Sequence, residues 1–256
     1  MDYIDIHCHL NLDEYNLDIQ ETIKRANDLK VGIIVVGVDI ESSRRAVKIA
    51  EENENIWACI GLHPADDPKE VFDFDAYKEL ASHPKVVAIG ETGFDYYHMK
   101  KEDGDRQREI FEKHIMIANE VNKPLMLHVR NGVNGEDAYK DAIESLKKHS
   151  KVHGDVHFFA GSLEQAHEFI NLGFKLSFTG VITFARNYDE VIKGIPLNMI
   201  ISETDSPYVT PVPYRGQRNE PSYVIEVVKK IAEIRGEDME VVRKQIVNNA
   251  KTLFKI

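Results

Sequence analysis

Short apolar runs rich in β-branched residues alternate along the chain with longer stretches in which apolar residues recur every three or four positions. The first pattern predicts buried β-strands, and the second predicts amphipathic α-helices. The predicted strands cover residues 3–7, 31–38, 56–62, 86–91, 124–129, 156–159, 174–178 and 199–203. The predicted helices cover 18–30, 42–53, 71–82, 106–121, 136–149, 163–172 and 189–195, and two more follow the last strand, at 222–235 and 239–253.

Strict alternation of strands and helices predicts a parallel sheet, because parallel neighbours need a crossover connection. The second strand is nearly all apolar, as expected for a strand that is covered on both faces. Eight strand–helix units predict an α/β fold, a (β/α)8 TIM-type barrel in a single domain over residues 1–256, close to the roughly 250 residues typical of such barrels. An open doubly wound sheet is the alternative. It normally has a glycine-rich turn after its first strand, and here that strand ends in His7-Cys8-His9-Leu10.

Composition narrows the class of protein further. No apolar run reaches roughly 18 residues, so we expect no membrane span. The acidic start of the chain argues against a secretory signal, and two cysteines imply no disulfide framework, so we expect a cytoplasmic protein. The chain has 32 basic and 43 acidic residues, a net charge of −11, which argues against a protein that coats nucleic acid. The oligomeric state is left open.

Residue types that bind metals stand at the ends of six of the eight predicted strands, where barrels of this kind carry their active sites. They are His7, His9, His63, Glu91, His128, His157 and Asp205. His7 and His9 are two positions apart on one strand, so their side chains share a face. Glu91 and Asp205 end buried strands, where an unpaired charge is costly, so both carboxylates should be paired or bound to a cation.

The carboxylate of Glu91 has two oxygens and could bridge two cations. We therefore expect two divalent metal ions, about 3.5–4 Å apart, that activate a water molecule. The expected ligands are His7, His9, Glu91, His128, His157 and Asp205. Mixed nitrogen and oxygen ligands suit Zn²⁺ or Mn²⁺, and the carboxylates are also compatible with Mg²⁺.

His153 competes with His157 for the ligand position on the sixth strand. We favour His157 because it lies within the apolar run of residues 156–159, where its side chain should point inward. The remaining histidines fall in predicted helices or loops and are expected at the surface; they are His83, His98, His114, His149 and His167.

At these positions the sequence resembles the TatD family of metal-dependent deoxyribonucleases, and the resemblance covers the whole chain. It rests on five blocks: Asp5-Ile6-His7-Cys8-His9, Gly61-Leu62-His63-Pro64, Gly90-Glu91-Thr92-Gly93-Phe94-Asp95-Tyr96-Tyr97, Glu203-Thr204-Asp205-Ser206-Pro207-Tyr208 and Arg215-Gly216-Gln217-Arg218-Asn219-Glu220-Pro221. The resemblance implies a TIM-type barrel, metal ligands at the same six positions, and hydrolysis of DNA phosphodiesters, often as a 3′-to-5′ exonuclease. Some family members have been linked to D-aminoacyl-tRNA deacylation.

The chain departs from the family pattern at two places. Around the sixth-strand ligand the family often carries a hydroxyl-bearing residue, where this chain has Ala160, and after the fifth-strand motif it often has Asp, where this chain has Asn131. Both changes leave the expected ligands intact and bear on the choice of substrate.

A DNA substrate, expected as single strands or 3′ ends, would have to overcome the acidic charge of the protein. We expect Arg130, Arg215 and Arg218 to grip phosphate near the metals, since guanidinium groups bind phosphate oxygens in a two-point fashion. The alternative is that Arg215 and Arg218 pair with surface acids such as Glu220. Glu91, Asp205 and His63 are the expected catalytic residues, and His63 would contact phosphate or donate a proton to the leaving oxygen.

Two other functions remain open. A metal-dependent amidohydrolase or lactonase would use the same barrel, but such relatives commonly place a carboxylated lysine between the metals, and no predicted strand ends in lysine. A non-catalytic metal-binding or nucleic-acid-binding protein is the other alternative. Six ligands shared by two ions leave room for water, which favours an enzyme.

Overall fold

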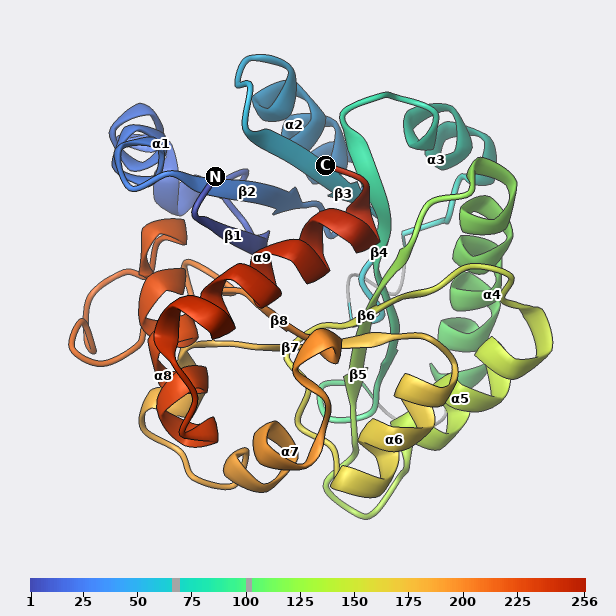
Figure 1. Ribbon diagram of the computed structural model, residues 1–256. Helices are drawn as coiled ribbons and strands as arrows, with labels where there is room; N and C mark the ends of the chain where they lie inside the picture. The colour runs from blue at the N-terminus through green and yellow to red at the C-terminus, as the bar shows by residue number, and fades with distance from the viewer. Residues whose placement is uncertain (66–69, 100–102) are drawn as a thin grey trace.

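The computed structural model of the protein describes residues 1–65, 70–99 and 103–256. Its eight parallel strands are hydrogen-bonded in chain order (Figure 1). They are β1 (Tyr3–Cys8), β2 (Val31–Val36), β3 (Ile56–Ile60), β4 (Val86–Asp95), β5 (Leu125–Arg130), β6 (Gly154–Val156), β7 (Lys175–Phe178) and β8 (Ile200–Ser202). Parallel order with a helical crossover after each strand confirms the (β/α)8 barrel.

The barrel closes between β8 and β1 just above the end of the last strand. Cys8 forms an isolated parallel bridge with Ser206. The backbone amide of Asp205 donates to the carbonyl of His7 at 2.9 Å, and the amide of His9 donates to the carbonyl of Ser206 at 2.8 Å. This junction therefore joins the His7–His9 segment directly to Asp205.

Helices surround the barrel as an outer layer, except the last helix, which lies across one end of it (Figure 1). They are α1 (Ile19–Asp28), α2 (Ile40–Glu51), α3 (Phe74–Ala81), α4 (Gly104–Val121), α5 (Ala138–His149), α6 (Leu163–Asn171), α7 (Asp189–Gly194), α8 (Val224–Arg235) and α9 (Met239–Phe254). Short 3-10 helices occupy Asp13–Tyr15, Gly180–Thr183, Leu197–Met199 and Pro221–Tyr223. Several helix starts are fixed by side-chain caps; at the start of α2, for example, the Asp39 carboxylate accepts from the Ser42 amide and the Asp39 amide donates to the Ser42 hydroxyl.

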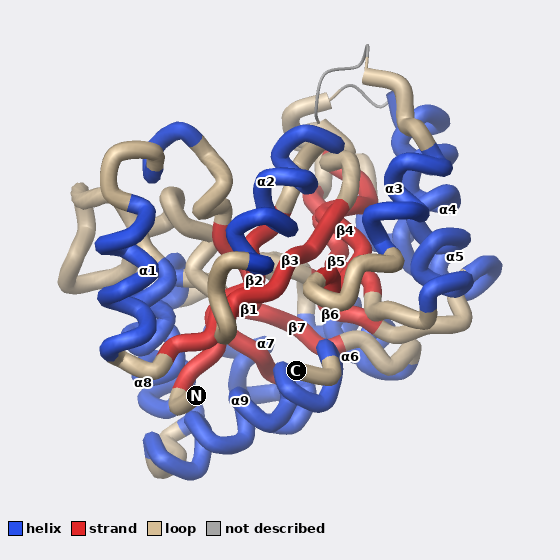
Figure 2. The backbone as a smooth tube through the Cα atoms, turned by 90° about the horizontal axis from the view of Figure 1, so that it is seen from above, coloured by secondary structure: helices blue, strands red, loops and turns tan. Residues whose placement is uncertain are grey.

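The core has two apolar clusters. The larger lies between the strands and the outer helices and contains side chains such as Phe94, Phe111 and Phe169. The second fills the barrel interior, where inward side chains including Ile4 and Ile34 meet α9. Helix α9 lies beneath the barrel at the end where both chain termini are found (Figure 2). One end of the barrel is thus filled by apolar side chains, and the polar site lies at the other end.

Most strand boundaries differ from the prediction by one or two residues, and two differ by more or in a way that matters for the site. β4 runs four residues past Glu91, to Asp95. The sixth strand was predicted too late in the chain, at 156–159. In the structure β6 covers Gly154–Val156, and Phe158 has a left-handed φ of 45°, which is incompatible with an extended strand. The error arose because Gly154 and Asp155, which pair with β5, have poor strand propensity. No helix among the described residues is both long and apolar enough to cross a membrane.

Candidate metal centre

A cavity of about 460 Å³ opens at the carboxyl ends of the strands. Its walls carry His9, His63, Glu91, His128, Arg130, His157 and Asp205 from the predicted set. His7 does not line the cavity but is fully buried next to it, with its Nε2 3.2 Å from the Nε2 of His9. The structure therefore brings together all six expected ligands and two of the expected substrate-binding residues.

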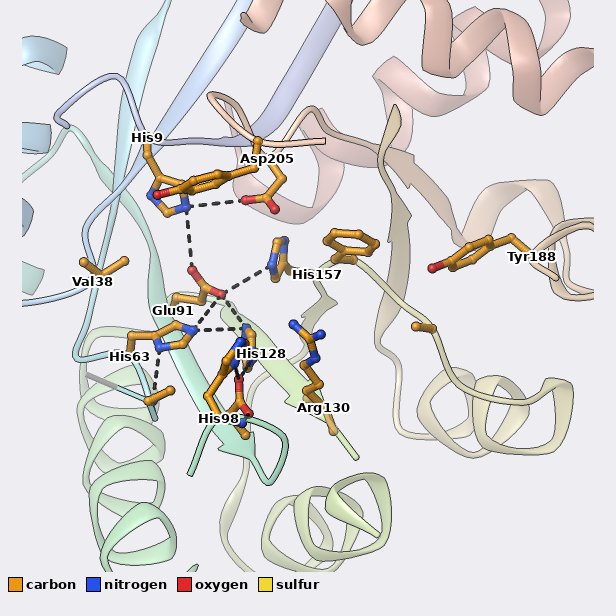
Figure 3. A pocket seen from close by; sticks show the side chains of 16 residues that line it. His9, Val38, His63, Glu91, His98, His128, Arg130, His157, Tyr188 and Asp205 are labelled. Carbon is orange, nitrogen blue, oxygen red and sulfur yellow. Dashed lines mark hydrogen bonds and ion pairs between the residues drawn. The ribbon is translucent and has the colours of Figure 1, made fainter. Parts of the chain in front are cut away.

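The carboxylate of Glu91 lies at the centre of the site, and its two oxygens face different imidazoles (Figure 3). Oε1 is 2.7 Å from His128 Nδ1 and 3.3 Å from His157 Nε2. Oε2 is 3.3 Å from His7 Nε2 and 4.0 Å from His9 Nε2. A single buried carboxylate thus joins two groups of nitrogen donors.

Asp205 completes the group on the β1 side of Glu91. Its Oδ1 is 3.5 Å from His9 Nε2 and 3.8 Å from His7 Nε2. Asp205 adopts a left-handed backbone, with a φ of 54°, which non-glycine residues rarely adopt. Such outliers cluster at functional sites, where the surrounding structure imposes them.

Acceptor oxygens lie behind three of the imidazoles, whereas His7 Nδ1 has no hydrogen-bond partner among the described residues. His9 Nδ1 lies 3.0 Å from the carbonyl of Val36, and His128 Nε2 lies 3.0 Å from Asp95 Oδ2. His157 Nδ1 lies 2.9 Å from Glu203 Oε1. Orientation of each imidazole by an acceptor on its other nitrogen is the usual arrangement around metal-binding histidines.

The charges within the site favour a cation. Burial raises the pKa of Glu91, but His157, His63 and His7 outweigh burial and hold that pKa well below its usual range. Burial lowers the pKa of His157, yet Glu203 and Glu91 outweigh it and raise the pKa to about 10. Without a metal, His157 therefore carries a proton that a divalent cation could replace.

The donor set fits a metal ion in chemistry as well as in charge. Three groups of donor atoms converge within 4.8 Å of one another: His7, His9 and Glu91; His63, Glu91 and His128; and His7, His157 and Glu203. Imidazole nitrogens and carboxylate oxygens suit Zn²⁺ and Mn²⁺ in particular. These buried clusters support divalent metal binding.

The three predicted arginines have different environments. Arg130 lines the cavity, and its guanidinium carbon lies 3.9 Å from the centre of the Tyr97 ring. Arg218 forms a two-point ion pair with Asp18, at 2.8 and 2.6 Å. Arg215 stacks on Phe184 at 4.1 Å and donates to the carbonyl of Thr210. Neither Arg215 nor Arg218 is among the described residues that line the cavity.

His153 and His157, the two candidates for one ligand position, lie in different places. His153 is outside the cavity, with its Nδ1 3.2 Å from the carbonyl of Leu172. His157 is 5% exposed and faces Glu91. Although the predicted strand boundary was wrong, the side chain that the prediction favoured is the one in the cluster.

Three polar residues at the site were missed. Asp95 and Glu203 are fully buried carboxylates, each beside an expected ligand, and both lie inside the sequence blocks quoted above. His98 lines the cavity and its Nδ1 is 2.8 Å from Asp95 Oδ2. The expectation of a surface position was wrong for one histidine. His114 is fully buried, and its Nε2 accepts from the Leu62 amide at 3.0 Å.

The barrel and the cluster at its mouth define a class of protein, the metal-dependent hydrolases. The model of the family described as TatD related DNase matches residues 4–255, and the chain belongs to that family. The uncharacterized metal-dependent hydrolase YabD of Bacillus subtilis is 44% identical, over 98% of this chain and 98% of its own. The uncharacterized metal-dependent hydrolase YcfH of Escherichia coli is 34% identical, over 99% and 96% of the two chains.

Solved structures agree with this placement. The crystal structure of YJJV, a TatD homolog from Escherichia coli, superposes with a TM-score of 0.88 at 30% identity, over 100% of this chain and 98% of that one. A TatD family hydrolase from Entamoeba histolytica superposes with a TM-score of 0.85 over 98% and 97%, and at 22% identity it supports the fold alone.

Proposed function

We propose that this protein hydrolyses phosphodiester bonds of DNA as a 3′-to-5′ exonuclease that uses two divalent metal ions. The observation that carries the proposal is the buried Glu91 carboxylate, whose two oxygens face separate groups of imidazoles. The family described as TatD related DNase supports the choice of substrate.

The residues divide into two ligand groups around Glu91. His7, His9 and Asp205 with Oε2 would hold one ion, and His128 and His157 with Oε1 would hold the other. When bound, two such ions generate a nucleophile from water and stabilise charge on the attacking and leaving oxygens. Asp205 would accept the proton of the attacking water on its carboxylate.

His63 and Arg130 would position the phosphate. The Ala65 amide lies 3.1 Å from His63 Nδ1, which makes that nitrogen the acceptor and leaves the proton on Nε2. Burial and the neighbouring His128 lower the pKa of His63, so its imidazole is neutral near pH 7. A neutral Nε2–H can donate a hydrogen bond to a phosphate oxygen, and we therefore favour this role over proton donation. Arg130 adds a positive group on the same wall.

The test is a substrate panel with metal-loaded protein. Chelated protein is reloaded with Mg²⁺, Mn²⁺ or Zn²⁺ and given single-stranded DNA labelled at either end, alongside amides, lactones and a D-aminoacyl-tRNA. We expect stepwise loss of nucleotides from the 3′ end, dependent on added metal. Cleavage of an amide, a lactone or the aminoacyl ester with intact DNA would overturn the proposal and favour the corresponding alternative.

A further inference from the structure

Exposed aromatic and apolar side chains, which we call the ridge, lie on the segments that follow β7 and β8, and one of them lines the cavity. We define it by Phe184, Tyr208, Val212 and Arg215; Phe184 is 44% exposed, Tyr208 51% and Val212 45%. The segments that carry these residues pack together, because the Val212 amide donates to the Thr183 hydroxyl at 2.9 Å. Exposed large hydrophobic side chains on neighbouring packed segments suggest an interaction surface.

One residue of the ridge also belongs to the cavity wall. Tyr208 belongs to both, since it lines the cavity and its ring lies 6.3 Å from the ring of His9. A polymer whose reacting bond lies at the metal ligands would therefore meet Tyr208 as it leaves the cavity.

Arg215 and Arg218, close in the sequence, differ in whether an acidic side chain neutralises their charge. Asp18 neutralises Arg218 in a two-point ion pair. Arg215 is exposed, and none of the ion pairs found over residues 1–65, 70–99 and 103–256 includes it. Its guanidinium instead lies 4.1 Å from the centre of the Phe184 ring. This pair offers a flat surface with a free positive charge, beside a cavity in a chain of net charge −11.

We propose that the ridge binds unpaired bases of a single-stranded nucleic acid whose scissile bond lies in the cavity. Base–aromatic stacking with cationic contacts to the backbone is how sequence-tolerant sites hold single strands, and arginine planes contribute to stacking. Bases within a duplex keep their faces stacked on one another, so the ridge selects single strands. The inference rests on the proposed function, because it extends the same substrate out of the same site.

Binding to the metal-loaded protein tests the ridge directly. The probes are a fluorescent single-stranded oligonucleotide with hydrolysis-resistant phosphorothioate linkages, an abasic strand of the same length and linkage, and a duplex. The readout is fluorescence anisotropy. We expect the abasic strand and the duplex to bind at least about fivefold more weakly than the single strand, since stacking is worth on the order of 1 kcal/mol or more per base.

Substitutions test which residues of the ridge bind the single strand. Phe184→Ala and Arg215→Ala should each raise the Kd for the single strand at least about fivefold, and Phe184→Ala should shrink the difference between base-containing and abasic strands. Arg44→Ala is the matched control, because it removes the same charge from an exposed position on α2, and its Kd should stay within about twofold.

Equal Kd values for the base-containing and abasic strands, or an unchanged Kd in Phe184→Ala, would overturn the proposal that the ridge binds bases. That result is distinct from failure of the proposed function. Wild-type protein that cleaves DNA while its Kd is insensitive to bases refutes only the ridge. Protein that cleaves no DNA with any metal refutes the proposed function, and base-dependent binding then shows whether the ridge is a nucleic-acid site without that chemistry.

Discussion

At the scale of single residues, Glu91 is a buried carboxylate in contact with four imidazoles. His7, His63, His128 and His157 all lie within 3.4 Å of its oxygens. The side chain is 4% exposed, so water screens these interactions little. A carboxylate in this setting remains ionised only because positive charge surrounds it, from protonated imidazoles or from metal.

Replacing Glu91 by alanine should therefore remove the link between the two ligand groups. We expect the activity of Glu91→Ala to fall by orders of magnitude and its bound metal, measured by elemental analysis, to fall below that of the wild type. The circular dichroism spectrum should stay that of a folded barrel. Glu21→Ala, at an exposed position on α1, is the control. Near-normal metal-dependent activity of Glu91→Ala would rule out the two-ion arrangement.

The choice between His157 and His153 gives a second test with a matched control in the chain itself. His157→Ala removes a nitrogen 3.3 Å from Glu91, and we expect lower metal content. His153→Ala changes an exposed side chain outside the cavity, and we expect unchanged metal content. Elemental analysis of both variants measures the bound metal. Loss of metal in His153→Ala with unchanged metal in His157→Ala would assign the ligand to His153 instead.

At the scale of elements, the sequence predicted most of the barrel because apolar periodicity reports burial. β2, for example, is buried along its whole length and was predicted as a nearly continuous apolar strand. The pattern failed where polar residues are buried. Asp155 lies fully buried in β6 with neither carboxylate oxygen hydrogen-bonded among the described residues, and such a residue gives no apolar signal.

The candidate site was predicted in part for a related reason. Ligand-type residues at strand ends can be read from sequence once the barrel is assumed, which is how Glu91 and Asp205 were found. Contacts between distant segments cannot be read in this way. Nothing in the local sequence shows that Asp18 pairs with Arg218, 200 positions away, or that Arg25 takes Glu220 instead.

Asp5 joins β1 to the segment that follows β8. Its Oδ1 accepts from the amides of His7, at 3.3 Å, and Thr204, at 2.8 Å. Both amides belong to segments that carry expected ligands. We expect Asp5→Ala to lower metal content and to cost about 1–3 kcal/mol of unfolding free energy, because it leaves buried donors unpaired.

Asp5→Asn retains an oxygen that can accept from both amides, so it should recover most of the metal content and stability. Metal analysis and urea unfolding of the two variants provide the measurement. If Asn is as damaging as Ala, the role of Asp5 as the acceptor that joins these segments is excluded.

His114 joins α4 to Leu62, just after β3, and to Thr92 of β4, whose hydroxyl oxygen lies 3.0 Å from its Nδ1. It is fully buried, its Nε2 accepts from the Leu62 amide, and its Nδ1 lies 2.8 Å from the carbonyl of Ile110. Burial lowers its pKa from 6.5 to about 4. Between those values the unfolded chain binds a proton that the folded chain does not. Stability from this residue is therefore present above pH 6.5 and is lost as pH falls toward 4.

A shift of this size corresponds to about 3 kcal/mol at most. We expect the unfolding free energy of wild-type protein, measured in urea, to fall between pH 7 and pH 5 by more than that of His114→Gln, whose amide does not titrate. His83→Gln, at a partly exposed histidine, is the control and should keep the wild-type slope. If the unfolding free energy of His114→Gln and of the wild type fell equally with pH, the pKa of His114 would be the same in the folded and unfolded chains.

At the scale of the whole molecule, the barrel separates its apolar and polar ends. Val247, Ala250 and Phe254 of α9 pack against the interior side chains at one end. Buried acids and imidazoles concentrate at the other, where Asp5, Glu91, Glu203 and Asp205 lie within a chain that already has a net charge of −11. Positive charge at this end should therefore stabilise the entire fold as well as serve the chemistry.

Metal removal tests this coupling between the site and the fold. A cation that binds only the folded state at a free concentration 100 times its Kd adds about 2.7 kcal/mol of stability per site. For a chain of this size each kcal/mol raises Tm by about 2–4 °C. We expect chelation to lower Tm by about 5–10 °C for one bound ion and by about twice that for two, with recovery when Mn²⁺ or Zn²⁺ is restored. Glu91→Ala should lose most of this response. A Tm that is the same with and without metal would mean that the cluster in the folded protein does not bind these ions at the concentrations used.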